Sequence, residues 1–499
     1  MARVLIALLV SLLATGAWAG PTARTVAGVV EGVDRGGVSR FLSIPYAAPP
    51  TGERRWRAPA PATPWAGVRP AVAFGPSCTQ NISARGWGPW TGEFSPQGAV
   101  SEDCLTLSVW TPSLRPGQKA AVMLWLPGGG FTDGGEATAV YDGEALARQG
   151  IVVVTINYRV AALGLLVHPA LETEPDGGKG NLPLRDALSA LQWVHANIAA
   201  FGGDPARVTV AGQSAGGALV YALLDAPEAA GLFAGAIVQS NPPDWGPLGD
   251  RAAAETVGSR IGAALGATDA AGLRAISPER VLAASGDDLN LFVDGVLIRD
   301  PRGASLPYVN DVPILTGLTA EEESFLKPGL KRYRDLVAAR GEAFARLYPA
   351  TDEAQARAVV LRSSRDRALL QLQRWSRAHA VGGQAPVWLY LWDHALPGPD
   401  AALYGAFHSA EVPYMFGALG AAPWRSFTAR DRAISATMLG YWANFVKSGD
   451  PNGPGLPAWP QPEAGATPVM TLGDSFAPFA PLADSVAVFW AGQDAAERF

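Results

Sequence analysis

One pentapeptide in the chain has the residue types of an acyl-transfer nucleophile. Residues 212–216 read Gly-Gln-Ser-Ala-Gly and match the pattern G-x-S-x-G. The pattern is short, but its context is informative: residues 208–211, rich in β-branched side chains, predict a strand before it, and residues 215–224 predict a helix after it. A sharp strand-to-helix turn lifts the serine hydroxyl above the sheet and points the helix N-terminus at a developing negative charge. This context favours Ser214 as a nucleophile over a structural serine.

A glycine-rich segment could supply the hydrogen-bond donors that acyl transfer also needs. Residues 128–131 read Gly-Gly-Gly-Phe and follow the apolar run 120–126, which predicts a second strand. Glycines let backbone N–H groups approach a substrate oxygen without interference from side chains. A dinucleotide-binding loop is the rival interpretation, but Asp133 stands where that fingerprint has its third glycine. We therefore predict an oxyanion-binding loop here, with the backbone N–H of Ala215 as a further donor.

The general base and the acid are less well determined by the residues alone. In α/β-hydrolases the nucleophile is followed by the acid and then by the histidine. Three histidines follow Ser214: His379 in a predicted helix, where it is a surface or packing residue, His394 at the end of a predicted strand, and His408 in a loop. A loop position favours His408, but spacing leaves His394 open. Three consecutive glutamates, residues 321–323, follow a predicted strand, and their chemistry does not distinguish among them.

The elements that must position these residues predict an α/β architecture. The runs between predicted helices are continuously apolar, as in parallel strands buried on both faces. One intervening segment, residues 184–198, has apolar residues at the i, i+3, i+4 and i+7 spacing of an amphipathic helix. We expect a mostly parallel sheet flanked by helices, in one domain over residues 20–499, with a helical insertion over 332–380. The predicted strands are residues 120–126, 151–158, 208–211, 235–239, 312–318 and 387–392.

Composition excludes several other classes of protein. The 499 residues are 48% hydrophobic and 17% charged, with a net charge of −6, so a largely disordered chain and a nucleic-acid-binding protein are both disfavoured. Only two cysteines and five histidines are present, without an H-E-x-x-H or paired C-x-x-C pattern, and no Walker A motif occurs. We therefore expect neither a metal site nor a bound cofactor.

The beginning of the chain has the pattern of an export signal. Residues 1–19 have a basic start, an apolar run of about ten residues and a small-x-small site, which predicts a signal peptide cleaved after Ala19. No other run is long enough to cross a bilayer. In an oxidising compartment Cys78 and Cys104, the only two cysteines, are expected to form a disulfide.

Several longer motifs, in order, resemble those of the type-B carboxylesterases, the carboxylesterase and cholinesterase-like branch of the α/β-hydrolases. The resemblance extends over residues 26–459, nearly the whole chain after the signal peptide. The segments that carry it are residues 44–50 (IPYAAPP), 101–105 (SEDCL), 157–159 (NYR), 180–181 (GN), 197–205 (NIAAFGGDP), 405–417 (GAFHSAEVPYMFG) and 441–453 (YWANFVKSGDPNG).

The resemblance implies an α/β-hydrolase fold and a particular set of catalytic residues. The family pattern around the acid assigns Glu322, and the GAxH motif assigns His408 as the base for Ser214. Gly129, Gly130 and Ala215 would then provide the oxyanion-hole N–H groups, and an early family disulfide maps onto Cys78 and Cys104. The implied reaction is hydrolysis of a small-molecule carboxylic ester through an acyl-enzyme.

Three positions depart from the family pattern. Pro127 replaces a histidine before the glycines, Gln213 replaces a glutamate before the nucleophile, and Glu323 replaces a glycine after the acid. Because Gln213 removes one negative charge beside the nucleophile, we expect choline esters to be poor substrates.

The substrate pocket leaves only a weak trace in the sequence. Trp87, Trp90 and Phe94 lie between the two cysteines, and Phe131 follows the glycines. We hypothesise that some of these rings wall an apolar acyl or aryl site. Two alternatives to a carboxylesterase stay open: an acyl hydrolase for amides, thioesters or lactones, and a non-catalytic binding protein on the same fold. The oligomeric state is not predicted.

Overall fold

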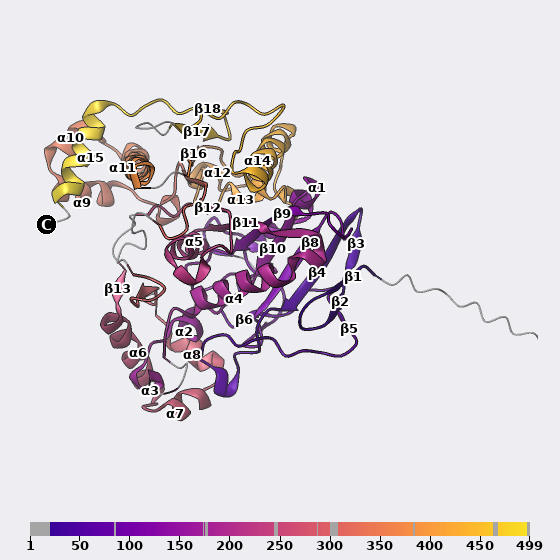
Figure 1. Cartoon of the computed structure of the whole chain (residues 1–499). Coiled ribbons are helices and arrows are strands. Elements are labelled where there is room, and N and C mark those ends of the chain that lie inside the picture. Colours follow the sequence, from indigo (N-terminus) through magenta and orange to yellow (C-terminus); the bar gives the residue numbers. More distant parts are fainter. Residues whose placement is uncertain are drawn as a thin grey trace, which may run out of the picture.

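The computed structural model describes residues 20–83, 86–172, 174, 178–243, 248–286, 288–299, 308–382, 385–462 and 468–496. The predicted signal peptide, residues 1–19, lies outside the described residues. Figure 1 shows a large twisted sheet with helices on both faces. Among the described helices, none is both long enough and apolar enough to cross a bilayer.

In the described part of the chain the central sheet has 11 strands, and its middle is parallel (Figure 1). All neighbours from β17 to β10 pair in parallel, whereas β18 at one edge and β8, β4 and β3 at the other pair antiparallel. The predicted mostly parallel sheet is therefore confirmed. In spatial order the strands are β18 (Ala477–Pro478), β17 (Val469–Leu472), β16 (Val387–Trp392), β15 (Ile314–Thr319), β12 (Gly235–Gln239), β11 (Gly203–Gln213), β9 (Ala120–Leu126), β10 (Val152–Ile156), β8 (Thr106–Thr111), β4 (Val38–Pro45) and β3 (Val33–Arg35).

The strand bounds differ in detail from the predicted ones. The run 151–158 forms a strand only over β10, the run 312–318 is shifted to β15, and the run 208–211 is the end of the longer β11. The main helices are α1 (Glu144–Arg148), α2 (Ala161–Leu165), α4 (Leu182–Asn197), α5 (Ala215–Asp225), α6 (Arg251–Leu265), α8 (Pro278–Ala284), α9 (Leu330–Arg340), α10 (Glu342–Leu347), α11 (Glu353–Gly382), α13 (Val412–Met415), α14 (Ala429–Ser448) and α15 (Asp484–Ala496).

Two apolar cores fix the helices to the two faces of the sheet. Successive side chains of a strand point to opposite faces. In β9, Val122 and Leu124 belong to the core beneath α4 and α5, whereas Met123 and Trp125 belong to the core that includes Met438 of α14. Every residue of β9 is buried, which explains why the strand is a continuous apolar run in the sequence.

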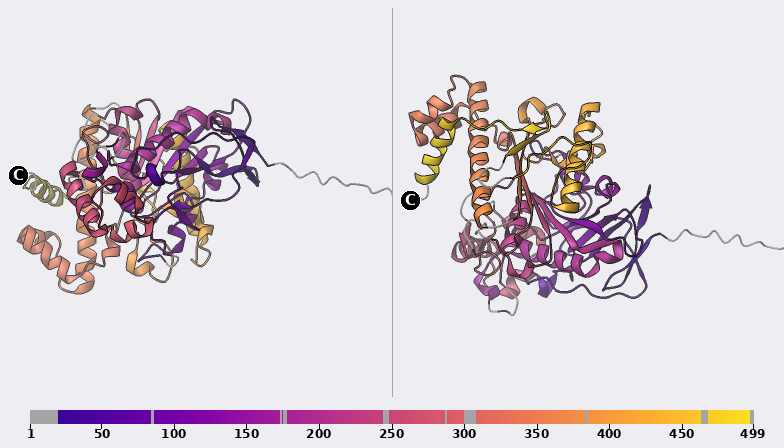
Figure 2. Two further views of the ribbon diagram at one scale, coloured as in Figure 1. Left: turned by 90° about the horizontal axis from the view of Figure 1, so that it is seen from below. Right: turned by 45° about the horizontal axis from the view of Figure 1, so that its top comes forward.

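The predicted helical insertion is a separate layer beside the sheet. Helices α9, α10 and α11 form it, and α15 from the end of the chain packs against them, as both figures of the whole chain show (Figures 1 and 2). Their shared core contains Phe344, Tyr348 and Trp490, and the Trp490 indole N–H donates to the Tyr348 hydroxyl at 3.0 Å.

Candidate active site

Ser214 lies at the turn between β11 and α5. Its backbone has φ 55° and ψ −124°, a conformation that costs energy for a residue with a Cβ. Neighbouring segments hold the turn: the Ser214 N–H donates to the Gln239 carbonyl at 2.9 Å, and the Asn241 amide donates to the Ser214 carbonyl at 2.8 Å. The strained turn is therefore tied to β12 and to the residues that follow it.

The two glycines of the pentapeptide are required by close backbone packing. A Cβ on Gly216 would lie 2.0 Å from the Leu126 carbonyl oxygen, and a Cβ on Gly212 would lie 2.4 Å from the Gly216 carbonyl carbon. Both separations are far below a van der Waals contact, so neither position accepts a side chain without movement of the backbone. The packing sets the first turn of α5 directly against the end of β9.

The three consecutive glutamates have three different partners. Glu322 Oε2 lies 2.5 Å from His408 Nδ1, and its Oε1 accepts the Thr319 N–H at 2.7 Å. Glu321 accepts the Ala406 N–H at 2.5 Å, and Glu323 accepts the Ser364 hydroxyl at 3.0 Å. Only Glu322 of the three contacts the histidine, so the geometry distinguishes residues that the sequence chemistry could not.

The electrostatics of the pair favour a protonated imidazole. Burial lowers the pKa of His408, but the charge and hydrogen bond of Glu322 and the charge of Glu411 outweigh burial and raise this pKa above its usual value. Glu411 is itself buried, and its Oε1 accepts the Gln239 amide at 2.9 Å. Burial and the neighbouring Glu322 charge raise the pKa of Glu411 to about 7. A second buried carboxyl group, that of Glu411, therefore also acts on the pKa of His408.

The glycine loop lies against the Ser214 turn. Gly129 and Gly130 have φ of 125° and 59°, and within the described part of the chain neither N–H has a protein acceptor. Ala215 is the first residue of α5, where N–H groups lack an intrahelical acceptor. Pro127 contributes its carbonyl, which accepts the Tyr158 hydroxyl at 2.5 Å and anchors the start of the loop.

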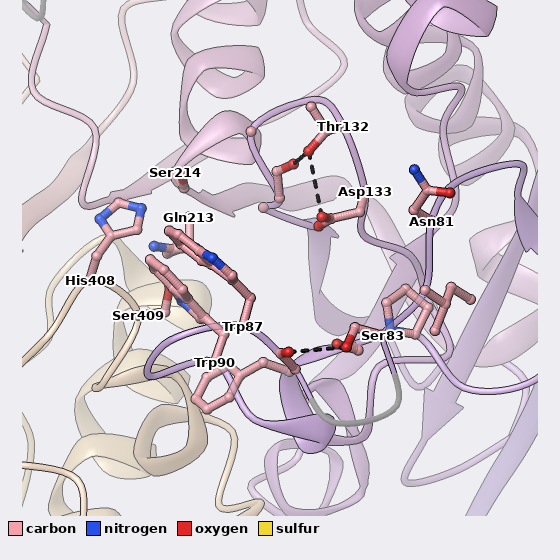
Figure 3. A pocket seen from close by; sticks show the side chains of 18 of the residues that line it. Asn81, Ser83, Trp87, Trp90, Thr132, Asp133, Gln213, Ser214, His408 and Ser409 are labelled. Carbon is pink, nitrogen blue, oxygen red and sulfur yellow. Dashed lines mark hydrogen bonds between the residues drawn. The ribbon is translucent and has the colours of Figure 1, made fainter. Parts of the chain in front are cut away.

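A single cavity of about 370 Å³ brings these elements together (Figure 3). Ser214, His408 and the three glycines 128–130 line it, and Figure 3 shows the His408 ring beside the Ser214 side chain. Small-molecule sites are typically concave pockets of about 300–1,000 Å³. The cavity is therefore large enough for a small organic substrate.

Aromatic side chains form one wall of the cavity. The Trp87 and Trp90 rings are stacked with centroids 5.2 Å apart, and the Phe325 ring lies 5.0 Å from that of Trp90. Trp90 also donates its indole N–H to the Ser409 hydroxyl at 3.1 Å, beside the histidine. Phe94 completes this wall, whereas Phe131 packs in the core and does not line the cavity, so the hypothesis fails for Phe131.

The segment that carries two of these tryptophans is closed by the predicted disulfide. Cys78 and Cys104 are bonded, with a sequence separation of 26 residues. Within the loop, the Trp87 and Trp90 backbones exchange hydrogen bonds of 2.7 and 3.0 Å. The loop is also held from outside, because buried Arg425 donates to Glu93 at 2.8 Å.

The other two histidines that follow Ser214, His394 and His379, have different partners. His394 bridges Asp474 and Asp431, with ring nitrogens 2.7 and 3.0 Å from the two carboxylates. His379 is 1% exposed in α11 and stacks on Trp375, so it is a packing residue rather than a surface one. Neither lines the cavity.

Comparison with known protein families agrees with this geometry. The model of the carboxylesterase family matches residues 19–378 and 342–481. The chain belongs to the carboxylesterase family. It is therefore a carboxylic ester hydrolase with the α/β-hydrolase fold, as the motifs indicated.

Three similar curated proteins are named as esterases or as a hydrolase. Fumonisin B1 esterase of Sphingopyxis macrogoltabida is 36% identical over 90% of this chain and 86% of that protein. Cocaine esterase of Homo sapiens is 33% identical over 85% of this chain and 82% of that protein. Phenmedipham hydrolase of Pseudarthrobacter oxydans is 32% identical over 91% of this chain and 95% of that protein.

Sequence reasoning missed several residues of this site. Asp133 and Phe325 line the cavity, and Glu411 lies behind the histidine. Glu411 stands three residues after His408, a spacing that was visible but uninformative without a structure. Phe325 follows the three glutamates, so the loop that carries these glutamates also supplies part of the aromatic wall.

Proposed function

We propose that this carboxylesterase works through an acyl-enzyme on Ser214, with His408 as general base and Glu322 as the acid that orients it. The observation that carries the proposal is the hydrogen-bonded pair Glu322–His408, whose histidine lines the same cavity as the strained Ser214 turn. Nucleophile, base and orienting acid in this relation are what serine hydrolysis requires.

The proposed reaction has two balanced halves. The Ser214 hydroxyl oxygen bonds to the ester carbonyl carbon while its proton moves to His408 Nε2, and the N–H groups of Gly129, Gly130 and Ala215 stabilise the oxyanion. The C–O bond then breaks, and the alcohol leaves with the proton from His408. Water repeats the sequence on the acyl-enzyme, releases the carboxylic acid and restores the Ser214 hydroxyl.

We also propose that the protein is exported. Two features support export: the signal-peptide pattern of residues 1–19, and the disulfide between Cys78 and Cys104, which is typical of oxidising compartments. N-terminal sequencing of the protein from the extracytoplasmic fraction of its host should then begin at Gly20. A chain in that fraction that still begins at Met1 would contradict cleavage.

Hydrolysis of p-nitrophenyl acetate, butyrate, octanoate and palmitate by the wild type and by Ser214→Ala tests the catalytic proposal. We expect turnover to vanish in the variant, and short and medium chains to be preferred because the cavity is about 370 Å³. If both proteins were folded and equally inert, amide, thioester and lactone panels would be the next comparison, and the Ser214 assignment for esters would be wrong.

A further inference from the structure

The cavity has a polar side opposite its aromatic wall, and one acidic side chain dominates it. Asn81, Ser83, Thr132 and Asp133 line this side, and Figure 3 shows Asp133 across the cavity from His408, with its carboxylate directed into the cavity. The sequence interpretation treated Asp133 only as a residue that interrupts a glycine pattern. Its position makes it a candidate contact for the substrate.

The Asp133 carboxylate has no cationic partner among the described residues. Within the described part of the chain, its only side-chain hydrogen bond is a long one, 3.5 Å, from the Thr132 hydroxyl. No lysine or arginine is found among the described residues that line the cavity. By contrast, Glu93 of the neighbouring loop is paired with Arg425, and Glu322 is paired with His408. Burial raises the pKa of Asp133 to about 6, so the group is mostly a carboxylate at neutral pH.

The charge also lies close to the place where the oxyanion forms. A Cβ on Gly129 would lie 2.4 Å from Asp133 Oδ1, so the carboxylate packs directly on the glycine loop. A negative charge packed against this loop disfavours a second negative charge held by the same loop. A positive group bound at Asp133 would remove this repulsion as well as gain a charge-assisted hydrogen bond.

The aromatic wall suits the same kind of group. Trp87 is 64% exposed, and its ring stacks on Trp90 across the cavity's aromatic side. Tryptophan faces attract cations, and more strongly when water is excluded. The residue before the nucleophile, Gln213, carries no charge, so Asp133 is the acidic group on the polar side of the cavity.

We propose that Asp133 is a specificity-determining residue that binds a protonated amine of the ester substrate. The inference rests on the proposed ester hydrolysis and names its substrate class. A primary, secondary or tertiary ammonium donates an N–H to the Asp133 carboxylate while its alkyl groups contact the indoles. A quaternary ammonium has no N–H to donate, so it gains less from Asp133 than a protonated amine does.

The test compares esters that differ only at one end. In the first series, p-nitrophenyl esters of one chain length carry a tertiary amine, a quaternary ammonium or an isosteric branched alkyl group on the acyl side. In a second series, the alcohol carries these groups. The readout is the ratio of kcat/KM for the amine ester to kcat/KM for the neutral ester. A ratio is insensitive to partial misfolding, and the neutral ester alone tests whether hydrolysis occurs at all.

In at least one series, we expect the wild type to favour the amine ester by about 10- to 100-fold, the range for a hydrogen bond to a charged group. Asp133→Asn should bring this ratio near one and should change the quaternary ratio less. Asp34→Asn is the matched control, because Asp34 is exposed on β3 outside the cavity and the change in charge is the same. Asp34→Asn should leave the ratio of kcat/KM values as in the wild type.

Three results would overturn the proposal. The first is a wild type that hydrolyses the neutral ester but shows no preference for the amine in either series. The second is an equal preference in Asp133→Asn, which would assign the cation to the aromatic rings. The third concerns Arg85, which lies outside the described residues: a preference that emerges only in Arg85→Gln would mean that Arg85, and not the substrate, neutralises Asp133.

Discussion

Replacing Glu322 by glutamine removes a charge without changing the shape of the side chain. In the wild type, Oε1 accepts the Thr319 N–H and Oε2 accepts His408 Nδ1–H. In the variant, the amide oxygen can keep the bond to Thr319, which turns the amide NH₂ toward Nδ1. The imidazole must then carry its proton on Nε2, the nitrogen that has to receive the proton of Ser214.

The size of the effect follows from the same geometry. Both side chains are about 90% buried, and Glu322 Oε2 lies 2.5 Å from His408 Nδ1. Opposite charges about 4 Å apart interact by about 4 kcal/mol at an effective dielectric constant of about 20, and this value sets the order of magnitude for the closer pair. This energy corresponds to about a thousandfold in rate, and the wrong tautomer can extend the loss to about ten thousandfold. The assay is kcat/KM for p-nitrophenyl butyrate, with circular dichroism to confirm folding.

The adjacent glutamates are matched controls for this substitution. Glu321→Gln retains an oxygen that can accept the Ala406 N–H, and Glu323→Gln retains one for the Ser364 hydroxyl, so each should keep activity within about tenfold of the wild type. If Glu322→Gln were as active as these two variants, or if either of them lost activity as severely, the assignment of the acid would be refuted.

Three further predictions concern the histidine, the nucleophile turn and the disulfide loop. Because the pKa of His408 is raised and its neutral form accepts the proton, kcat/KM should fall on the acid side with a midpoint above the usual pKa of histidine. Glu411, whose pKa is about 7, carries a negative charge over part of this range, so Glu411→Gln should move the midpoint to lower pH; a midpoint that stays in place would exclude a role for Glu411. Gly216→Ala should abolish activity and lower the melting temperature, because the added Cβ meets the Leu126 carbonyl. Gly492→Ala in α15 is the control, because its added Cβ has no described atom within 4 Å and should change neither property; equal effects of the two substitutions in thermal unfolding and ester assays would contradict the packing argument. Replacing both Cys78 and Cys104 by alanine should lower the free energy of unfolding by about 3.5 kcal/mol, the value expected for a 26-residue separation. Urea titration against the oxidised wild type measures this change, and a change below about 1 kcal/mol would show that the crosslink does not stabilise the fold.

The strands that the sequence revealed are those buried on both faces. Every residue of β16 is buried, and its run of apolar side chains needs no partner to be recognised. Strand β8 is also buried throughout, but it contains Thr106 and Ser108, whose hydroxyls both donate to Glu136. That partner lies about thirty residues further along the chain, so the polar residues obscured a strand that only the fold explains.

The site also divides into residues that local sequence predicts and residues that only the fold explains. Ser214 and the glycine loop could be predicted because the turn and the loop place strict local demands on residue type. The choice among residues 321–323 depends on which side chain faces His408 across a distance of 86 residues in the sequence, and only the family resemblance anticipated it. Asp133 left no local signal, since its importance comes from the cavity around it.

Labelling with a fluorophosphonate tests the central claim, that Ser214 is the activated nucleophile. The serine oxygen would bond to phosphorus as fluoride leaves, and intact-mass and peptide spectrometry would locate the adduct. We expect one adduct per chain, on Ser214, that is absent in Ser214→Ala. In Glu322→Gln the adduct should form more slowly by a factor of about 100 or more, from the interaction energy of Glu322 with His408. An adduct on another residue, or equal labelling of Ser214→Ala, would contradict the proposed mechanism.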